Sequence, residues 1–332
     1  MSGPVVWSEA TRSALYGHGG FYHRPQGPAG HFRTSVHASP LFASAVAALL
    51  ARLDDAMGHP DRLDLVDVGA GRGELLGQVL DGLRGGGSLA ARVRLAGVDL
   101  AQRPPDLDQT VGWSADLPEH VVGLVVANEW LDNVPVDVVE AGPDGPRRVM
   151  VDPASGEESP GGPIGLRDAA WLSQWWPLDG VPLGWRAEVG FPRDLAWAAA
   201  VRCLDRGVAL AVDYGHLLTD RATGGYAGGT MAGYRDGRRV RPVPDGSCDI
   251  TAHVAVDSCA AAGVSAGADS TVMLTQREAL AQVQAPVPAG ARDQLLHRSQ
   301  LSELVDPDGL GSFTWLVQSV GLGGWQPLTG PT

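Results

Sequence analysis

The stretch LVDVGAGRGEL (65–75) joins an apolar run to an aspartate and three closely spaced glycines. Glycine permits positive φ angles and close approach of a ligand to the backbone, so a strand running into such a turn is typical of a nucleotide-like ligand site. Gly69, Gly71 and Gly73 follow a GxGxG pattern, which differs from the GxGxxG pattern of dinucleotide-binding folds. The glycines alone leave two ligand classes open: a dinucleotide with a pyrophosphate, and an adenosyl cofactor without phosphate.

Two aspartates at predicted strand ends bear on this choice. Asp67 would repel a pyrophosphate, whereas it would attract the ammonium and sulfonium groups of S-adenosylmethionine. Asp99 can accept hydrogen bonds from both hydroxyls of a ribose, which either ligand class would supply. We therefore expect S-adenosylmethionine as the cofactor, against the alternative that both aspartates are capping or solvated acids.

The stretch ANEWLDNVP (127–135) follows another apolar run, VVGLVVA (121–127). Ligands of open α/β sheets lie at the carboxyl ends of the strands, so Asn128, Glu129 and Asp132 are expected in the same crevice as the glycine turn. The Asn128 amide can hold a nucleophile, and the two carboxylates can bind a cationic substrate and neutralise the charge that accompanies N-methylation. The alternative is that Asp132 caps a turn and Glu129 is exposed.

Alternating strands and helices predict a doubly wound, mostly parallel α/β sheet. Ser39 and Pro40 begin a helix as N-cap and first helical residue. The hairpin expected over 135–152 precedes a Gly-, Pro- and Trp-rich insertion, and residues 1–38 are interpreted as irregular. The predicted strands are 64–68, 92–98, 121–127 and 207–212, with helices from 39, after the glycine turn, and over 194–204.

Composition excludes several classes of protein. The 332 residues contain no lysine and carry a formal net charge of −13, which disfavours nucleic acid as the main partner. Three cysteines without a CxxC pair, and the absence of a signal peptide or membrane span, predict a cytoplasmic protein without membrane insertion. No metal motif, GxSxG elbow or P-loop is found, so no metal is expected.

Several motifs together resemble the MidA-like S-adenosylmethionine-dependent methyltransferases, which include the mitochondrial complex I assembly-factor protein arginine methyltransferase. The resemblance extends over nearly the whole chain, and ANExxDxxP with DITAHV is its most specific part. The matching stretches are GHFRTS (30–35), VDVGAGRGEL (66–75), ANEWLDNVPV (127–136), AVDYG (211–215) and DGSCDITAHV (245–254), with weaker matches at Thr275-Gln276 and GLGSF (309–313).

The resemblance implies a class I methyltransferase (Rossmann-like) fold with an insertion after the fourth strand. The implied domains are an N-terminal segment covering the cofactor site (1–38), a methyltransferase domain (39–136 and 188–332) and the insertion (137–187). The implied cofactor residues are Asp67, Gly69, Gly71, Gly73, Asp99 and Asn128, with Thr34 and Ser35 as a lid. The implied catalytic residues are Glu129 first, Asp132 second, then Asn128 and Tyr214, with Asp213, Asp249, Thr251 and His253 lining the crevice.

The implied reaction is protein arginine N-methylation, with a respiratory-complex subunit as the acceptor by analogy; a homodimer is compatible with the sequence. Three departures leave the acceptor open: His31 replaces an aspartate, His37 lies near an expected acid, and TMAGYRDG (230–237) lacks a histidine. A small-molecule methyltransferase and a non-catalytic assembly chaperone that binds the cofactor remain alternatives. A dehydrogenase is disfavoured by GxGxG and Asp67.

Overall fold

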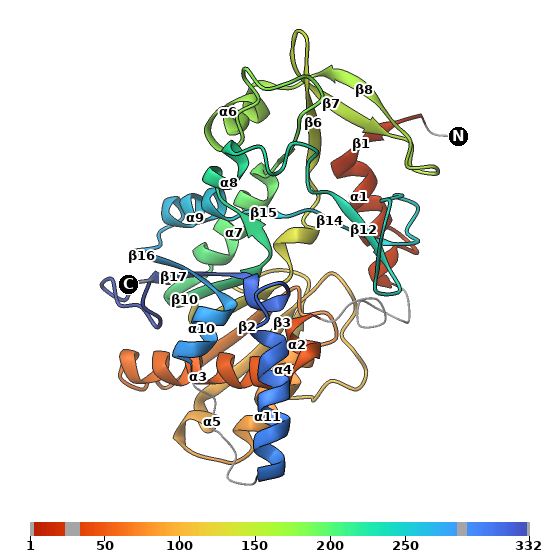
Figure 1. Ribbon diagram of the computed structural model, residues 1–332. Coiled ribbons are helices and arrows are strands. Elements are labelled where there is room, and N and C mark those ends of the chain that lie inside the picture. Colours follow the sequence, from red (N-terminus) through yellow and green to blue (C-terminus); the bar gives the residue numbers. More distant parts are fainter. Residues whose placement is uncertain (1–2, 24–33, 284–290, 331–332) are drawn as a thin grey trace. The chain divides into compact units, whose positions relative to one another are not determined.

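The computed structural model describes residues 3–23, 34–283 and 291–330 (Figure 1). The chain forms two compact units, which are described separately below. Unit 1 comprises Met1–Phe32, Leu131–Trp197 and Gly215–Ala261, and unit 2 comprises Arg33–Trp130, Ala198–Tyr214 and Ala262–Thr332. The domain boundaries predicted at residues 38, 136 and 187 stay predictions. The two compact units group residues 215–261 with the hairpin region.

Unit 2 is built on a seven-stranded sheet in the order β16-β17-β10-β5-β2-β3-β4. All neighbouring strands are parallel except at β17, which is antiparallel to both β10 and β16. The prediction of an α/β fold with a mostly parallel sheet is therefore confirmed. The strands are β2 (Leu63–Val68), β3 (Val93–Val98), β4 (Gly112–Ser114), β5 (Val121–Asn128), β10 (Leu204–Asp213), β16 (Ser270–Thr275) and β17 (Thr314–Val320).

The strand order reverses between β2 and β5. From β2 the chain adds β3 and β4 on one side, then crosses back to add β5 and β10 on the other. Ligands of open α/β sheets bind at the carboxyl ends of the strands at such a reversal. The ends of β2 and β5, at Val68 and Asn128, are therefore where a ligand is expected.

The helix predicted from Ser39 is α3 (Pro40–Met57), with the Ser39 side chain accepting a hydrogen bond from the Leu41 N–H at 3.1 Å. Its apolar stripe, including Phe42, Val46 and Leu50, is buried in the core of this unit because these residues recur at helical spacing. The other helices in unit 2 are α2 (Ser35–Ala38), α4 (Glu74–Leu83), α5 (Ser88–Arg92), α10 (Gln276–Gln282), α11 (Ala291–Leu304) and η4 (Leu310–Ser312).

Unit 1 contains smaller, mainly antiparallel sheets. The predicted hairpin is present as β6 and β7, and these strands pair further with β1, β8 and β9. A second sheet has the order β13-β12-β14, and β11 pairs with β15. The strands are β1 (Val5–Val6), β6 (Asp137–Gly142), β7 (Gly145–Val151), β8 (Glu158–Pro163), β9 (Arg186–Val189), β11 (Gly215–His216), β12 (Ala232–Arg235), β13 (Arg238–Val240), β14 (Asp249–Thr251) and β15 (Val254–Ala255).

The helices of unit 1 include one that the sequence reading missed. Residues 1–38 were expected to be irregular, which is wrong, because α1 (Trp7–Tyr16) buries Trp7, Ala10, Ala14 and Leu15 at helical spacing. The glycines and histidines around this segment are typical of loops, so the helical spacing of its apolar residues was not recognised. The others are η1 (Phe21–His23), η3 (Leu131–Asn133), α6 (Leu166–Trp175) and α8 (Leu218–Ala222), while α7 (Phe191–Arg202) and α9 (Val256–Ser265) run across the unit boundaries.

One predicted helix is shifted by a few residues. The helix predicted over 194–204 is α7, which ends at Arg202 because Leu204 already pairs with Val121 in the sheet.

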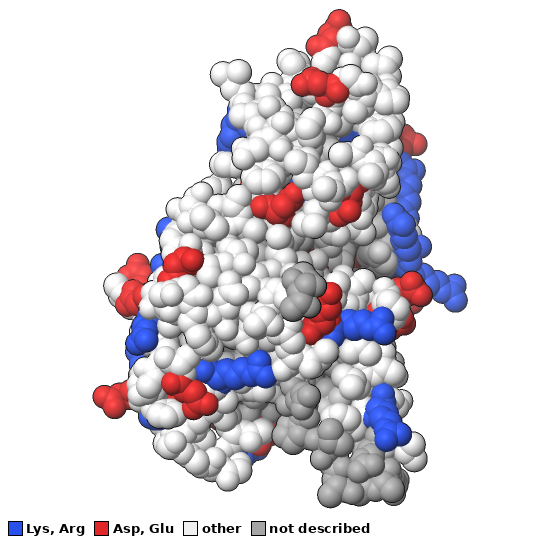
Figure 2. Space-filling model, turned by 60° about the vertical axis from the view of Figure 1, so that its left-hand side comes forward, with Lys and Arg blue, Asp and Glu red and all other residues white. Residues whose placement is uncertain are grey.

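Figure 2 shows acidic and basic side chains interspersed over the face in view. No helix of the described residues is long and apolar enough to cross a bilayer.

Candidate functional site

The glycine turn follows β2 at the reversal of strand order. Gly69 and Gly73 have φ angles of 74° and 75°, which disfavour any residue with a side chain. A Cβ atom on Gly69 would lie 2.7 Å from Cδ1 of Trp130, and one on Gly73 would lie 2.8 Å from Cδ1 of Leu107. Both positions therefore favour glycine by conformation, and at Gly69 the Trp130 side chain also limits the space.

Asp99, directly after β3, is tied to this turn. Its Oδ2 accepts a hydrogen bond from the Gly71 N–H at 2.9 Å, and its Oδ1 accepts one from the Ala101 N–H at 2.8 Å. An ionised carboxylate has about four acceptor sites, so each oxygen can accept another hydrogen bond. The partly exposed Asp99 is thus held in place with capacity for the two hydroxyls of a ribose.

Asp67 is buried near the same turn, with 4% of its surface exposed. Burial, followed by the nearby charges of Asp99 and Glu74, raises the pKa of Asp67 well above its ordinary value. The alternative that Asp67 is a solvated acid is therefore wrong. A cationic ligand group would favour the ionised form of this carboxyl and would offset the like charges around it.

Asn128 is the last residue of the neighbouring strand β5, and Glu129 follows it. Asn128 donates from Nδ2 to Glu129 Oε1 at 3.2 Å, while its buried Oδ1 has no hydrogen-bond partner among the described residues. A buried acceptor without a partner is costly, so it fits an N–H donor on a ligand. Together with the glycine turn and Asp99, the residues present fit an adenosyl cofactor that carries an amine.

The segment that contains Thr34 and Ser35 is fixed to both sides of this region. Ser35 is fully buried, and its N–H donates to Glu129 Oε1 at 2.9 Å. His37 hydrogen bonds to Thr34 Oγ1 at 2.7 Å and lies 3.2 Å from Glu74 Oε1, at the start of α4. The predicted role of Thr34 and Ser35 as a lid stays a prediction, and His31 and the rest of GHFR (30–33) lie outside the described residues.

The backbone of Glu129 is unusual, with a φ of 50° and its N–H bonded to Val212 O at 2.8 Å. We expect Glu129→Ala to lower the free energy of unfolding by about 1–3 kcal/mol, because the buried Ser35 N–H loses its acceptor. Glu129→Gln keeps an acceptor oxygen and should lose less. Urea denaturation of both variants, with exposed Glu119→Ala as control, measures this, and a loss no larger than the control's would contradict it.

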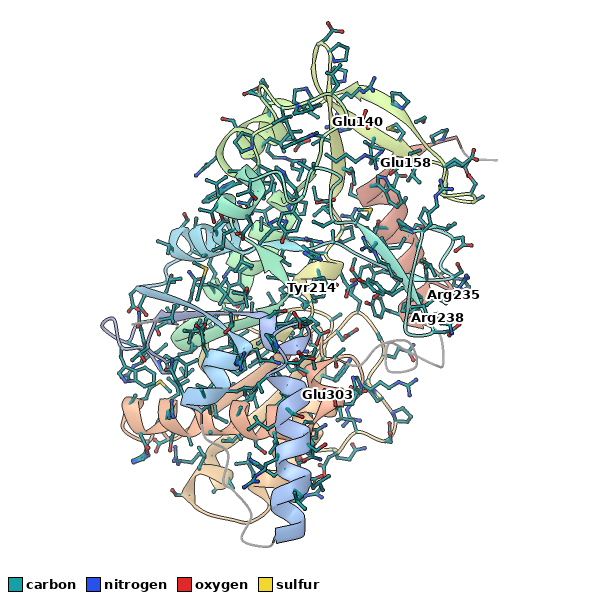
Figure 3. The ribbon with its side chains drawn as sticks, in the orientation of Figure 1. Glu140, Glu158, Tyr214, Arg235, Arg238 and Glu303 are labelled. Carbon is teal, nitrogen blue, oxygen red and sulfur yellow. The ribbon has the colours of Figure 1, made fainter. Side chains whose placement is uncertain are left out.

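Asp213 is the last residue of β10, and Tyr214 follows it. Asp213 is buried and accepts the Tyr214 N–H at 3.0 Å. The Tyr214 ring, labelled in Figure 3, lies 5.3 Å from the ring of Phe313 in the GLGSF motif. In the other weakly matching motif, Thr275-Gln276, the Gln276 side chain accepts a hydrogen bond from Ser35 Oγ at 3.2 Å. Both weakly matching motifs thus belong to the packing of unit 2.

Asp132 belongs to unit 1, where it lies in a buried acidic cluster. Asp249 accepts hydrogen bonds at Oδ1 from Tyr22 at 3.2 Å and from Asn133 at 3.1 Å. Burial and then the charge of Asp132 raise the pKa of Asp249 to about 7. The rings of Tyr16 and Tyr22 stack at 5.5 Å beside it. We call Tyr16, Tyr22, Asp132, Asn133 and Asp249 the acidic cluster.

The backbone around the acidic cluster is held by a buried arginine. Arg193 donates to the carbonyls of Asp132 at 2.6 Å, Val134 at 3.2 Å and His253 at 2.7 Å. Burial, then the Arg193 charge, lowers the pKa of His253 to about 4, so His253 is neutral at pH 7. Thr251 is buried within β14. Arg193 therefore links the two predicted motifs, ANEWLDNVP and DITAHV, within unit 1.

The sequence reading missed Tyr16, Tyr22 and Asn133 in this cluster. Asn133 lies within the stretch ANEWLDNVP, so the sequence could have identified it as a candidate. Tyr22 contacts Asp249 across 227 residues, and nothing in the local pattern indicated this contact.

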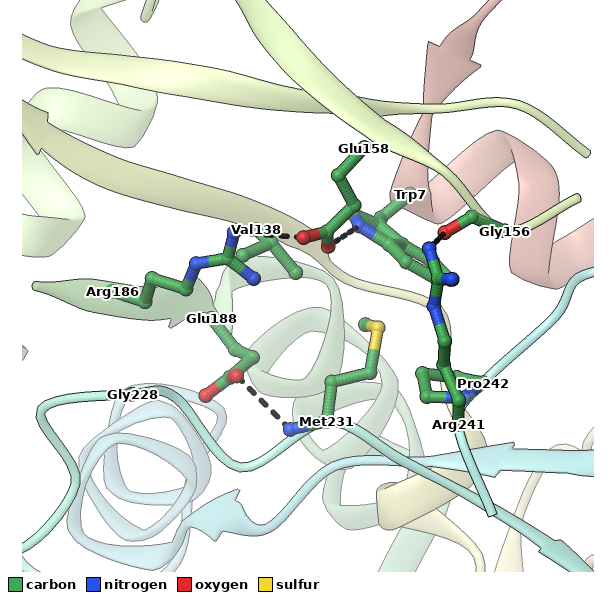
Figure 4. A pocket seen from close by; sticks show the side chains of 10 residues that line it. All are labelled: Trp7, Val138, Gly156, Glu158, Arg186, Glu188, Gly228, Met231, Arg241 and Pro242. Atoms are coloured by element: carbon green, nitrogen blue, oxygen red, sulfur yellow. Dashed lines mark hydrogen bonds and ion pairs between the residues drawn. The ribbon is translucent and has the colours of Figure 1, made fainter. Parts of the chain in front are cut away.

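A cavity of about 150 Å³ lies in unit 1 (Figure 4). Glu158 accepts from the indole of Trp7 at 2.9 Å and pairs with Arg186 at 2.7 Å, and Glu188 accepts from the Met231 N–H at 3.2 Å. Glu188 also accepts from Thr230, and Arg241 donates to the Gly156 carbonyl, so the charged groups around the cavity have partners, and no predicted site residue lines it. We assign no ligand to it.

One group among the described residues has metal-ligand spacing: Asp54, Asp55 and His59. Asp54 already binds Arg92 through both oxygens, at 2.6 and 2.7 Å, and His59 at 2.9 Å. These ion pairs account for Asp54 without a metal.

The largely parallel sheet carries a glycine turn, an acidic strand end and a buried free acceptor at the point where its strand order reverses. These features define an α/β protein that binds an adenosyl-type ligand. Comparison with known proteins narrows this class. Residues 45–274 match the family model described as "Putative S-adenosyl-L-methionine-dependent methyltransferase". The chain belongs to this family, and it is an S-adenosylmethionine-dependent methyltransferase.

Solved structures agree with this assignment. A COG1565 superfamily member from Burkholderia thailandensis, bound to S-adenosyl-homocysteine, is similar with a TM-score of 0.79 and 26% identity, over 98% of this chain and 90% of that chain. A native structure of a COG1565 superfamily protein from the same organism gives a TM-score of 0.79 and 27% identity over the same shares. A search of curated protein sequences gave no match.

Proposed function

We propose that this methyltransferase methylates a nitrogen of a cationic acceptor, and specifically an arginine side chain of a protein. The motifs that resemble those of MidA-like enzymes support the arginine as acceptor. A respiratory-complex subunit as acceptor and an insertion after the fourth strand are finer parts of the same proposal and rest on the resemblance, whereas the proposed cytoplasmic location rests on the cysteine usage of the sequence.

On the cofactor side, we assign the glycine turn, Asp99 and Asn128 to binding. Asp99 would accept from the ribose hydroxyls, and Asn128 Oδ1 would accept from an amine. Asp67 would face a cationic group, which fits its burial among carboxylates. The bound cofactor supplies an electrophilic sulfonium methyl group.

On the acceptor side, the observation that carries the proposal is the acidic cluster of unit 1. A guanidinium has a pKa near or above 12.5, so a transferred methyl group must be accompanied by loss of a proton. Asp249, with a pKa of about 7 beside Asp132, is suited to bind the cation and to accept that proton. Carboxylates that fix a planar guanidinium also orient its nitrogen for attack.

In this proposal the role of base moves from Glu129 to the carboxylates of the acidic cluster. Glu129 was the first candidate for the base, but its Oε1 already accepts from the Ser35 N–H and from Asn128. We therefore propose that Glu129 positions the segment around Ser35, and that Asp132 and Asp249 act on the acceptor.

Transfer of labelled methyl groups tests the proposal. The protein is incubated with methyl-labelled S-adenosylmethionine and either arginine-containing peptides and proteins or small amines, and the products are hydrolysed and separated. We expect label in methylarginine, with transfer reduced about a hundredfold in Asp249→Asn and retained in the exposed control Asp245→Asn. Label in small amines alone would favour the small-molecule alternative and would contradict the arginine assignment.

A further inference from the structure

Strands β12 and β13 form a tight, arginine-rich hairpin in unit 1. Its turn residues, Asp236 and Gly237, have φ angles of 51° and 71°. Two consecutive positive φ angles are typical of a type I′ turn, whose twist matches that of the strands. The hairpin end is therefore a defined structure that holds its side chains at fixed positions.

The charges on this hairpin are not balanced. Arg235, Arg238 and Arg239 are exposed, and within the described part of the chain the side chains of these three arginines make no hydrogen bond or ion pair. Arg235 lies directly opposite Arg238 in the strand register, and like charges in this position are destabilising. Asp236 is the one acidic residue between Arg235 and Arg239. The hairpin therefore carries a local excess of positive charge in a chain of net charge −13, and this excess does not stabilise the folded chain.

The hairpin is continuous with the acidic cluster. Strand β12 also pairs with β14, where Tyr234 lies opposite Asp249. Arg239 lies opposite Tyr234 on the other side, and Arg235 is the next residue along β12 (Figure 3). Successive side chains of a strand point to opposite faces, so Arg239 shares the face of Tyr234 and Asp249, while Arg235 and Arg238 lie one residue further along, on the other face at the end of the hairpin.

We propose that the β12–β13 hairpin is a docking surface for an acidic segment of a polypeptide. Where the proposed function holds, this segment flanks the acceptor arginine, because the hairpin and the acidic cluster share one sheet. The arginines would attract carboxylates of the segment while the acidic cluster takes the cation between them. Extended polyanions such as nucleic acid or an anionic membrane would meet the repulsion of the whole chain, whereas a short peptide would not.

Peptide binding tests this surface independently of methyl transfer. Fluorescence anisotropy compares labelled peptides that have a central arginine flanked by glutamates, by glutamines or by lysines. We expect the glutamate peptide to bind about tenfold more tightly than the glutamine peptide at low salt, from a few exposed ion pairs, with the difference reduced by high salt. The same preference is expected when glutamine replaces the central arginine, so docking can be confirmed even if the acceptor assignment fails.

The decisive variant is Arg235→Gln/Arg238→Gln/Arg239→Gln. It should lose the preference for the glutamate peptide while keeping its affinity for S-adenosylmethionine. The control Arg94→Gln/Arg202→Gln/Arg277→Gln removes the same charge from exposed positions in unit 2 and should keep the preference. Equal binding of the glutamate and glutamine peptides, a preference that survives in the hairpin variant, or tighter binding of duplex DNA or of phosphatidylserine vesicles would overturn the proposal.

Discussion

Asp99→Ala is expected to weaken S-adenosylmethionine binding by about a hundredfold or more. The change removes the proposed acceptor of two ribose hydroxyls, and hydrogen bonds to charged groups contribute about 1.5–3 kcal/mol each. It also removes the acceptor of the Gly71 and Ala101 N–H groups, which hold the turn in its observed form. Isothermal titration calorimetry of both proteins measures the difference.

Two further variants separate the ribose contacts from damage to the turn. Asp99→Asn keeps one carbonyl oxygen, so we expect an intermediate affinity. The exposed Asp116→Ala has the same change in charge and should bind like the unmodified protein. An Asp99→Ala protein that folds and keeps its affinity within about twofold would contradict the assigned role of this carboxylate, since each factor of ten corresponds to about 1.4 kcal/mol.

Asp249→Asn is expected to lower kcat by about a hundredfold while cofactor affinity stays unchanged, because a general base contributes about 10²–10⁴ to the rate. In the unmodified protein kcat should rise with pH and level off above about 7, since Asp249 must lose its proton before it can accept another. The variant should lack this rise. A pH series of initial rates at saturating cofactor measures both effects.

The same substitution should change stability in a distinctive direction. The pKa of Asp249 is raised from 3.8 to about 7 on folding, so the folded protein binds more protons than the unfolded chain between these values. The free energy of unfolding should therefore fall as pH rises through this window, and Asp67 adds to the fall in the same direction. Asp249→Asn should show a smaller fall. A variant that is inactive and also less stable at pH 8 would indicate a structural role instead.

The sequence predicted those parts of the fold that rest on local patterns. The apolar runs of β2 and β5 and the Ser39-Pro40 cap of α3 lie where they were expected, because buried parallel strands and helix caps leave strong local signals. Helix α1 was missed even though its burial follows the helical period, since neighbouring glycines and histidines suggested a loop.

Contacts between distant segments could not be predicted in this way. The glycine turn indicated the ligand region, but nothing in the sequence showed that Trp130 packs against Gly69 or that Glu129 accepts from Ser35. The raised pKa of Asp249 likewise depends on its burial and on the charge of Asp132, which lies in a distant segment of the chain. Residue types identified the candidates, and tertiary packing determines which of them can act as base, anchor or acceptor.

The most direct test of the central claim is calorimetric titration of the protein with S-adenosylmethionine and, separately, with NAD. We predict binding of S-adenosylmethionine alone, because the buried Asp67 carboxyl favours a cationic ligand group and disfavours a pyrophosphate. Binding of NAD, or of neither ligand, would contradict the assignment of the glycine turn to a sulfonium cofactor.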